Sequence, residues 1–219
     1  MVEVATSLLS IEKEKSIQTI YNLEVAGANY FHIDVMDGKF VKNNTIENMR
    51  EYTEYIKQIT NTKIEVHLMV EDVEAYSKAY IDMGVNSIIF HIESLKNETE
   101  ILKLISFIKQ NNVQVGLTLN PKTPIEKIYP YLSYLHKVLI MSVEPGEGGQ
   151  KFIPEAIEKI QKLNIFAYEN GYDIDIEVDG GINDKTAKKV IEVGANIVVA
   201  GSYITNSENY KEAIESLKK

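Results

Sequence analysis

Two histidines and two aspartates in this sequence have the types and spacing of a metal site. His32 and Asp34 lie two residues apart in an apolar stretch, so on a β-strand their side chains share one face. His67 and Asp179 stand at the ends of two further apolar stretches. If these ends converge in space, imidazole and carboxylate groups could hold zinc, iron(II), manganese or cobalt. The two carboxylates could also supply an acid and a base.

Each of these side chains, taken alone, is equally well explained as a hydrogen-bonding residue at the start of a loop. Four of them at corresponding positions are harder to explain in that way. His91 also ends an apolar stretch, but we interpret it as a structural histidine or one that contacts a ligand from behind. His136 instead precedes an apolar stretch, so it lies at the N-terminal end of the expected strand, away from the candidate site. We expect it at the surface.

Glycines gather after the last three apolar stretches and suggest an anion site. They are Gly146, Gly148 and Gly149 around Glu147, then Gly180 and Gly181, then Gly201 followed by Ser202. Each group could be only a turn. Backbone N–H groups in such loops can nevertheless hold a phosphate without basic side chains, and this chain has a single arginine, Arg50.

Three of the six methionines, Met36, Met69 and Met141, also lie at strand ends. Residue by residue, core packing explains them well, because methionine fills irregular gaps. At the mouth of a site they would instead form a dry, polarizable wall around a reacting carbon.

The composition is that of a folded globular protein and excludes several functions. The 219 residues carry 23 basic and 32 acidic side chains, a formal net charge of −9, which argues against nucleic acid as a partner. The absence of cysteine excludes disulfides, thiolate metal sites and a cysteine nucleophile. No apolar stretch approaches the ~18 residues of a membrane helix. With no secretory signal in view, we expect no membrane partner and a cytoplasmic location.

Short apolar stretches alternate with longer amphipathic ones along the whole chain. The short ones predict β-strands over 3–8, 30–35, 63–69, 87–91, 114–119, 138–143, 175–179 and 197–200. The longer ones predict helices over 11–26, 46–59, 72–83, 98–111, 124–134, 154–170, 185–193 and 207–217. Several of the strands are apolar on both faces, as the strands of a parallel sheet covered by helices are.

Three similar junctions indicate a repeating unit. Gly27-Ala28-Asn29, Gly84-Val85-Asn86 and Gly194-Ala195-Asn196 each follow a helical stretch and precede a strand. Glycine there can end a helix in the left-handed conformation. The junctions lie 57 and 110 residues apart, close to two and four multiples of one eighth of the chain. This spacing predicts one domain over 1–219, a (β/α)₈ TIM barrel with its site at the C-terminal strand ends, rather than a doubly wound sheet.

Seven short motifs through nearly the whole chain resemble those of the ribulose-phosphate 3-epimerase family. They are Ser7-Leu8-Leu9-Ser10, His32-Ile33-Asp34-Val35-Met36-Asp37-Gly38, His67-Leu68-Met69-Val70, Gly116-Leu117-Thr118-Leu119-Asn120-Pro121, Met141-Ser142-Val143-Glu144-Pro145-Gly146, Gly148-Gly149-Gln150 and Glu177-Val178-Asp179-Gly180-Gly181. The resemblance implies a TIM barrel of the ribulose-phosphate-binding type. It also implies an isomerase of the pentose phosphate pathway that interconverts D-ribulose 5-phosphate and D-xylulose 5-phosphate through an enediolate.

The same resemblance implies a role for each candidate residue. The ligands of one divalent metal ion, for which we expect Zn²⁺ before Fe²⁺, Mn²⁺ or Co²⁺, would be His32, Asp34, His67 and Asp179. Asp34 and Asp179 would double as the acid/base pair. Ser7 and His67 would contact the ketose phosphate, and Met36, Met69 and Met141 would flank the planar intermediate. Its phosphate would bind at Gly146, Glu147, Gly148, Gly149, Gly180, Gly181, Gly201 and Ser202.

The sequence departs from the family pattern in three loops. Glu147 stands where an aromatic residue is usual, and an acidic side chain beside an anionic ligand is unexpected unless it points outward. Lys42 replaces a usual proline, and Ile11-Glu12 replaces a usual Ala-Asp pair. These changes lie in loops, so they do not alter the expected metal chemistry. They do not settle how long a sugar the site accepts or how its loops close over the substrate.

Two alternative functions and the assembly also stay open. A D-allulose 6-phosphate 3-epimerase would use the same chemistry, although its variants often lose the double glycine that is kept here. A barrel that only binds a sugar phosphate would have no need of two carboxylates at one carbon. An aldol or decarboxylation chemistry would need a positioned lysine, and none ends a strand on the expected catalytic face. The resemblance favours a homo-oligomer. The pairs Tyr52 with Tyr55 and Tyr76 with Tyr80 could form a contact between subunits, or they could pack their helices against the barrel.

Overall fold

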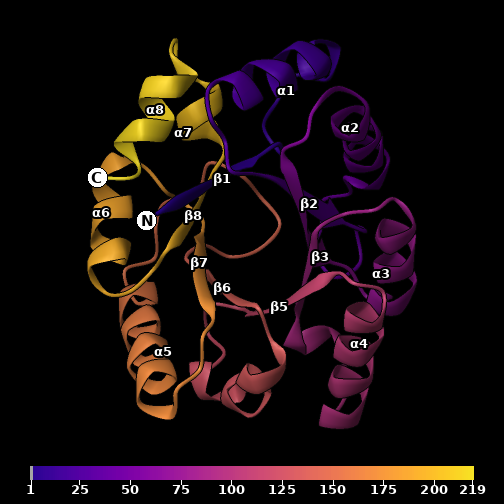
Figure 1. Ribbon diagram of the computed structural model, residues 1–219, viewed down its shortest axis with the longest axis vertical. Coiled ribbons are helices and arrows are strands. Elements are labelled where there is room, and N and C mark those ends of the chain that lie inside the picture. Colours follow the sequence, from indigo (N-terminus) through magenta and orange to yellow (C-terminus); the bar gives the residue numbers. More distant parts are fainter. Residues whose placement is uncertain (1) are drawn as a thin grey trace.

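The computed structural model describes residues 2–219 and consists of eight parallel strands closed into a barrel. The strands are β1 (Glu3–Ser7), β2 (Tyr30–Met36), β3 (Lys63–Met69), β4 (Ser87–His91), β5 (Gln114–Leu119), β6 (Lys137–Met141), β7 (Asp175–Asp179) and β8 (Ile197–Ala200). Each pairs with its neighbours along the chain, and β8 closes the barrel onto β1. The predicted TIM barrel is therefore confirmed (Figure 1).

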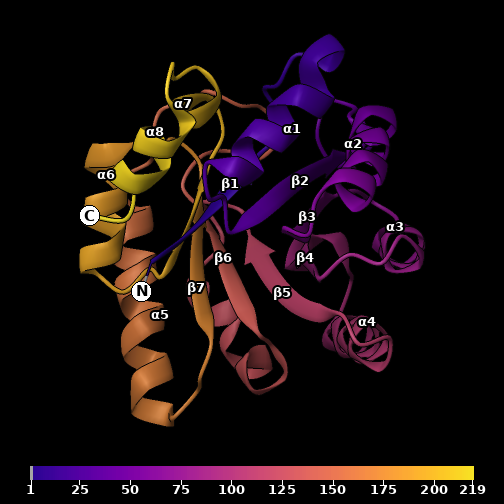
Figure 2. The same cartoon turned by 45° about the horizontal axis from the view of Figure 1, so that its top comes forward.

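Helices surround the barrel, as Figures 1 and 2 show from two directions. They are α1 (Ser16–Val25), α2 (Ile46–Ile59), α3 (Val73–Asp82), α4 (Glu98–Gln110), α5 (Ala156–Asn170), α6 (Asp184–Glu192), α7 (Ser202–Thr205) and α8 (Tyr210–Ser216), with 3₁₀-helices η1 (Lys13–Lys15), η2 (Ile92–Ser94), η3 (Ile125–Lys127) and η4 (Tyr129–Tyr134). Their apolar faces and the outward residues of the strands form one continuous core. Within residues 2–219, no helix combines the length and apolarity that a membrane crossing requires.

Several predicted element boundaries are wrong, beginning with the helix expected over 11–26, whose α-helical part begins only at Ser16. Residues 124–134 form η3 and η4 instead of one helix, because Pro130 lacks the N–H that a continuous helix needs there. The helix expected over 207–217 begins only at Tyr210, where Asn209 accepts a hydrogen bond from the Glu212 N–H at 3.2 Å. The sixth strand ends at Met141 rather than at residue 143.

The tyrosine pairs and His136 serve packing. Tyr52 and Tyr80 are only 2% and 3% exposed, and Tyr55 and Tyr76 are half-buried against the same core. A homo-oligomer therefore stays a prediction that these residues do not support. His136, expected at the surface, is partly exposed there, and its Nδ1 accepts the N–H of Val115 at 3.2 Å.

The Gly-x-Asn junctions fix the N-terminal edge of the barrel. The Oδ1 atoms of Asn29, Asn86 and Asn196 accept the backbone N–H of Val4, Ile64 and Ile176, at 2.9, 2.8 and 2.7 Å. Each junction asparagine thus binds the start of the strand that precedes its own in the barrel. The preceding glycines have positive φ angles of 92°, 74° and 119°, which non-glycine residues rarely adopt. The repeated motif is a device for joining neighbouring strands.

Asn196→Ala tests this device. The substitution leaves the Ile176 N–H without its side-chain acceptor and also removes the 2.6 Å hydrogen bond to Asp175. We expect the free energy of unfolding to fall by about 1–2 kcal/mol in denaturant titrations, with metal affinity unchanged. An unaltered unfolding midpoint would show that the junction asparagine contributes no register-specific stability.

Candidate active site

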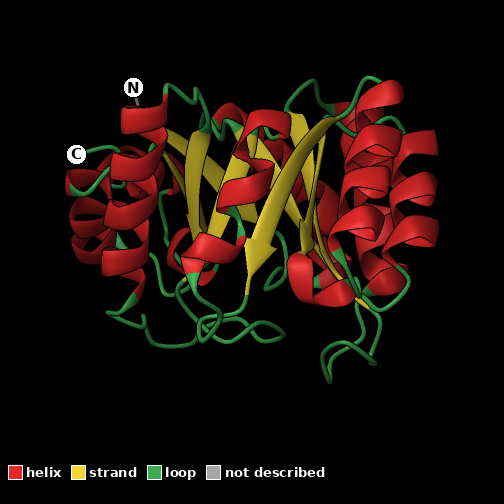
Figure 3. Cartoon of the chain, turned by 90° about the horizontal axis from the view of Figure 1, so that it is seen from below, coloured by secondary structure: helices red, strands yellow, loops and turns green. Residues whose placement is uncertain are grey.

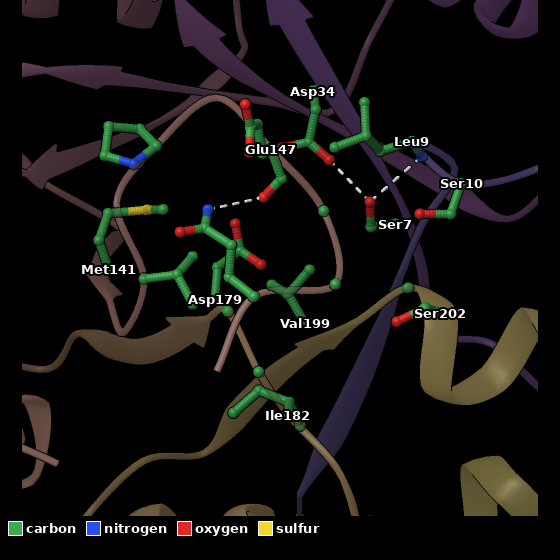
Figure 4. A pocket seen from close by; sticks show the side chains of 18 of the residues that line it. Ser7, Leu9, Ser10, Asp34, Met141, Glu147, Asp179, Ile182, Val199 and Ser202 are labelled. Carbon is green, nitrogen blue, oxygen red and sulfur yellow. Dashed lines mark hydrogen bonds between the residues drawn. The ribbon is translucent and has the colours of Figure 1, made fainter. Parts of the chain in front are cut away.

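A cavity of about 540 Å³ opens at the C-terminal end of the barrel, where the longer loops gather in Figure 3. Its lining includes Asp34 and all of the predicted substrate-binding residues except His67, which is fully buried behind it. These residues are Ser7, Met36, Met69, Met141, Gly146, Glu147, Gly148, Gly149, Asp179, Gly180, Gly181, Gly201 and Ser202. Figure 4 shows Asp34, Asp179 and Met141 around its floor, with Ser7 and Ser202 on the side formed by β1 and α7. Its size suits a small phosphorylated ligand.

The four predicted metal ligands come together at the floor of this cavity. Each offers one atom, and these atoms lie within 4.8 Å of one another. Asp34 Oδ1 is 3.4 Å from His32 Nε2 and 3.3 Å from His67 Nδ1, while Asp179 Oδ2 is 4.0 and 3.8 Å from the same two nitrogens. His32 Nε2 is buried without a hydrogen-bond partner anywhere in residues 2–219. A nitrogen and oxygen donor set of this kind fits a divalent transition metal.

His67 presents Nδ1 to the cluster because its other nitrogen contacts His91. The two Nε2 atoms are 2.9 Å apart, and His91 Nδ1 is 3.6 Å from Glu93 Oε2. Burial lowers the pKa of His67 to about 4 and also lowers that of His91, so both rings are neutral near pH 7. In a metal-loaded site, a proton on His67 Nε2, donated to His91, would leave Nδ1 free as a ligand. His91 thus contacts His67, a predicted ligand, from behind, which is one of the two arrangements expected from the sequence.

Asp34 is held as a carboxylate. Ser7 Oγ donates to its Oδ2 at 2.7 Å, as Figure 4 shows, and the backbone oxygen of Asp34 accepts from Thr45 Oγ1 at 2.6 Å. Burial favours the neutral acid, but His32 and His67 outweigh it and hold the pKa of Asp34 far below its usual range. The pKa of His32 shifts in the opposite direction to that of Asp34. Burial opposes the charged form of the ring, but Asp34 and Glu65 outweigh burial and raise the pKa well above the usual value.

Asp179 has the opposite character. Burial, and then the negative charge of Asp34, raise the pKa of Asp179 to about 7. Its backbone is fixed by Ser142, whose N–H and Oγ both bind the Asp179 carbonyl oxygen, at 2.8 and 2.9 Å. The two carboxyl groups of the site therefore have widely separated proton affinities, a pattern found where one acts as base and the other as acid.

The separated pKa values predict a pH-dependent release of protons on metal binding. Asp179 must be ionised to act as a ligand, and in the metal-free protein it is mostly protonated at pH 6 and mostly ionised at pH 8. From Asp179 alone, we expect about 0.8 fewer protons to be released per Mn²⁺ bound at pH 8 than at pH 6. Calorimetry in buffers of different ionisation enthalpy measures this number, and a constant value across the range would contradict the assignment.

The loop after β7 needs both of its glycines. A Cβ on Gly180 would lie 2.4 Å from Val143 Cγ2, and one on Gly181 would lie 2.5 Å from the Phe152 backbone nitrogen. Both also have positive φ, at 117° and 63°. The backbone of this loop can therefore pass close to neighbouring segments and to a ligand, as the phosphate loops of such barrels do.

Glu147 lies at the mouth of the cavity. The residue is exposed, so its side chain is not buried against the floor, yet it contributes to the lining. Gln150 Nε2 donates to the backbone oxygens of Glu144 and Glu147, at 2.6 and 2.9 Å, and so closes this loop on itself. Lys42 and Glu147 line a second hollow beside the cavity, so two of the three departures from the family pattern meet at the rim.

Comparison with known proteins decides the family. The sequence profile described as the Ribulose-phosphate 3 epimerase family matches residues 3–205. The chain belongs to the ribulose-phosphate 3-epimerase family. Its relatives include proteins named ribulose-phosphate 3-epimerase from Methanocaldococcus jannaschii (39% identical, covering 100% of this chain and 90% of the relative), Bacillus subtilis (39%, 100% and 99%) and Escherichia coli (34%, 98% and 94%).

Solved structures share the fold at lower identity. A 3-hexulose-6-phosphate synthase from Salmonella typhimurium superposes with a TM-score of 0.71 at 15% identity, covering 98% of this chain and 96% of that one. At this identity the likeness concerns the barrel alone. The family of metal-dependent epimerases is thus identified from the sequence relatives, and the His/Asp cluster of this chain is consistent with it.

Sequence reasoning missed three charged residues beneath the ligands, Glu65, Lys137 and Glu177, all buried. A signal existed for two of them. Glu65 and Glu177 stand two residues before His67 and Asp179, so on β3 and β7 they share the inward face of those ligands. Lys137, the first residue of β6, belongs to no motif and gave no such signal.

Proposed function

We propose that this protein interconverts D-ribulose 5-phosphate and D-xylulose 5-phosphate by moving a proton at C3. The observation that carries this proposal is the pair Asp34 and Asp179 at one cavity floor, with pKa values displaced in opposite directions. The names of the full-length relatives supply the substrate class. Which carbon of a sugar phosphate loses its proton depends on which carbon lies between the two carboxyl groups, and in this proposal that carbon is C3.

Asp34 and Asp179 divide the proton transfer between them. Asp34, the carboxylate with the low pKa, takes the C3 proton from one side in one direction of the reaction. Asp179, ionised as a ligand in the resting site, takes up a proton from water and returns it to C3 from the other side, and Asp34 releases the abstracted proton to water before the next turnover. Ser7 keeps the Asp34 oxygen oriented through its 2.7 Å hydrogen bond. Met36, Met69 and Met141, each at most 3% exposed, exclude water from the planar enediolate. Reversal of the two roles gives the reaction in the other direction.

A divalent ion, which we propose to be Zn²⁺ with Fe²⁺, Mn²⁺ or Co²⁺ as alternatives, would be held by His32 Nε2, Asp34 Oδ1, His67 Nδ1 and Asp179 Oδ2. The chemistry that such an ion supplies is stabilisation of the negative charge that develops on the ketose oxygens. The phosphate would lie against the loops at Gly146–Gly149, Gly180–Gly181 and Gly201–Ser202, where backbone N–H groups replace the missing arginines. An assembly of several copies and a cytoplasmic location stay proposals, as does the extent of the domain over 1–219.

Deuterium exchange tests the reaction. In D₂O, metal-reconstituted protein should incorporate deuterium at C3 of ribulose 5-phosphate while xylulose 5-phosphate accumulates. Asp34→Asn and Asp179→Asn should each lower the exchange rate by at least ~10²-fold, with metal content measured on the same samples to separate proton transfer from metal loss. Absence of exchange in the reconstituted protein would refute the proposal, and binding without turnover would favour a sugar-phosphate-binding barrel.

A rate comparison separates the two epimerase substrates. We expect a higher kcat/KM on ribulose 5-phosphate than on allulose 6-phosphate, because the double glycine Gly180-Gly181 and its close contacts with Val143 and Phe152 leave a compact phosphate end. A higher kcat/KM on the hexulose phosphate would make the six-carbon sugar the substrate and leave the proton-transfer chemistry unchanged.

Glu147→Gln tests the electrostatics of the cavity mouth. Glu147 adds a negative charge to the lining that must accept a phosphate dianion. Its removal should lower KM about two- to fourfold at low ionic strength, and salt should screen most of that difference. An equal KM for both proteins at low salt would mean that the Glu147 carboxylate faces away from the bound phosphate.

A further inference from the structure

A group of charged side chains lies inside the barrel beneath the proposed metal site, and the proton transfer does not use it. Glu65 on β3, Lys137 on β6 and Glu177 on β7 are each at most 1% exposed. Lys137 Nζ lies 2.5 Å from Glu65 Oε2 and 3.0 Å from Glu177 Oε2. Apolar residues of similar volume would fill this space at no desolvation cost. Stability alone therefore does not explain the charges.

The charged group reaches the metal site through His32. Glu65 Oε1 is 2.8 Å from His32 Nδ1, while His32 Nε2 faces Asp34 and Asp179. An imidazole that ligates a metal through Nε2 carries its proton on Nδ1, and an acceptor at Nδ1 selects that tautomer and the ring orientation. Glu65 is that acceptor for His32, in the same way that His91 receives the proton of His67.

Lys137 holds Glu65 in this position. Its ammonium binds the Oε2 oxygen, so the Oε1 oxygen of the same carboxylate remains directed at His32. The ammonium also supplies the positive charge that allows Glu65 and Glu177 to lie side by side. His32, Glu65 and Glu177 have a spacing that could itself hold a metal ion, but the Lys137 ammonium already binds both carboxylates there.

Neighbouring residues leave room for this lysine. Gly116 on β5 pairs with Lys137, and a Cβ on Gly116 would lie 2.9 Å from Lys137 Cγ and 3.0 Å from Ile89 Cγ1. The Tyr30 ring lies 4.7 Å from the ammonium, within the range of a cation–π contact. The interior layer is thus fitted to a lysine at this position.

We propose that Lys137 is a positioning residue of the metal site, which through Glu65 orients His32 so that Nε2 is available to a divalent ion. This inference rests on the metal site proposed above. It goes beyond that site by assigning a function to a side chain that contacts Glu65 and Glu177 rather than a proposed ligand or the substrate.

Lys137→Met tests the inference through metal affinity. Zinc-loaded protein is titrated with a chromophoric chelator, and we expect the zinc dissociation constant of the variant to rise about 10- to 100-fold. In ¹⁵N-labelled zinc-loaded protein, the His32 Nδ1 proton should exchange faster with water in the variant. Ile89→Val is the matched control, because it alters packing in the same layer without touching a charge, and it should keep the wild-type zinc affinity.

A double variant supplies a rescue. In Lys137→Met with Glu65→Gln, the neutral amide oxygen can accept from His32 Nδ1 without a counter-charge, and the amide N–H groups can donate to Glu177. This protein should recover most of the zinc affinity that Lys137→Met loses. A general loss of barrel stability would not be repaired in this way.

The outcomes separate the inference from the metal site itself. Equal zinc affinity in the wild type and Lys137→Met would overturn the positioning function and leave the metal site intact. Absence of zinc binding by the wild type would overturn the metal site and, with it, this inference. If Lys137→Met does not fold, Gly116→Ala is measured instead, since its methyl group displaces the lysine side chain. Weaker zinc binding there supports the inference, and unchanged binding overturns it.

Discussion

Mutual repulsion among four carboxyl groups inside one closed barrel is the constraint on which the rest of the site depends. Asp34, Glu65, Glu177 and Asp179 lie within two successive inward positions of three strands, where little water is present to screen them. The structure answers with different partners at the two levels. The lower pair binds the Lys137 ammonium, and the upper pair surrounds two imidazoles, a set that a dication would complete. Burial, together with the remaining repulsion from Asp34, raises the pKa of Asp179 in the metal-free protein.

Both histidines at the floor of the cavity obey the same rule although their neighbours differ. Each has one nitrogen toward the carboxylates and the other bound behind, His32 to Glu65 and His67 to His91. Which nitrogen faces the carboxylates depends on the position of the residue behind the ring. Glu65 binds Nδ1 of His32 and leaves Nε2 toward the carboxylates, whereas His91 contacts Nε2 of His67 and leaves Nδ1. The orientation of both proposed ligands therefore depends on residues that do not line the cavity. This dependence links the chemistry at the strand ends to packing deeper in the barrel.

The fold and the upper part of the site could be predicted from the sequence because both depend on local patterns. The alternation of apolar and amphipathic stretches indicates eight βα units. His32 and Asp34 are two residues apart, so their side chains share one face of a strand. The predicted boundaries of helices were wrong where a single residue interrupts an amphipathic pattern. Pro130 does so in the region 124–134, which was expected to be one helix. Lys137 could not be found in this way, because its partners come from β3 and β7, 72 and 40 residues away, and only closure of the barrel brings them together.

The junction asparagines at the far edge of the barrel have a consequence for the metal ligands. Side chains on a strand alternate between interior and exterior, so a slip of one residue of β2 against β1 would turn His32 outward and bring Ile33 to the axis. Such a slip would remove every donor atom of that strand at once, while the loops around the cavity could do nothing to prevent it. Asn29, Asn86 and Asn196 fix three of these alignments from the opposite end. The loops at the mouth are thereby free to diverge, as Glu147 has, without endangering the coordination chemistry below them.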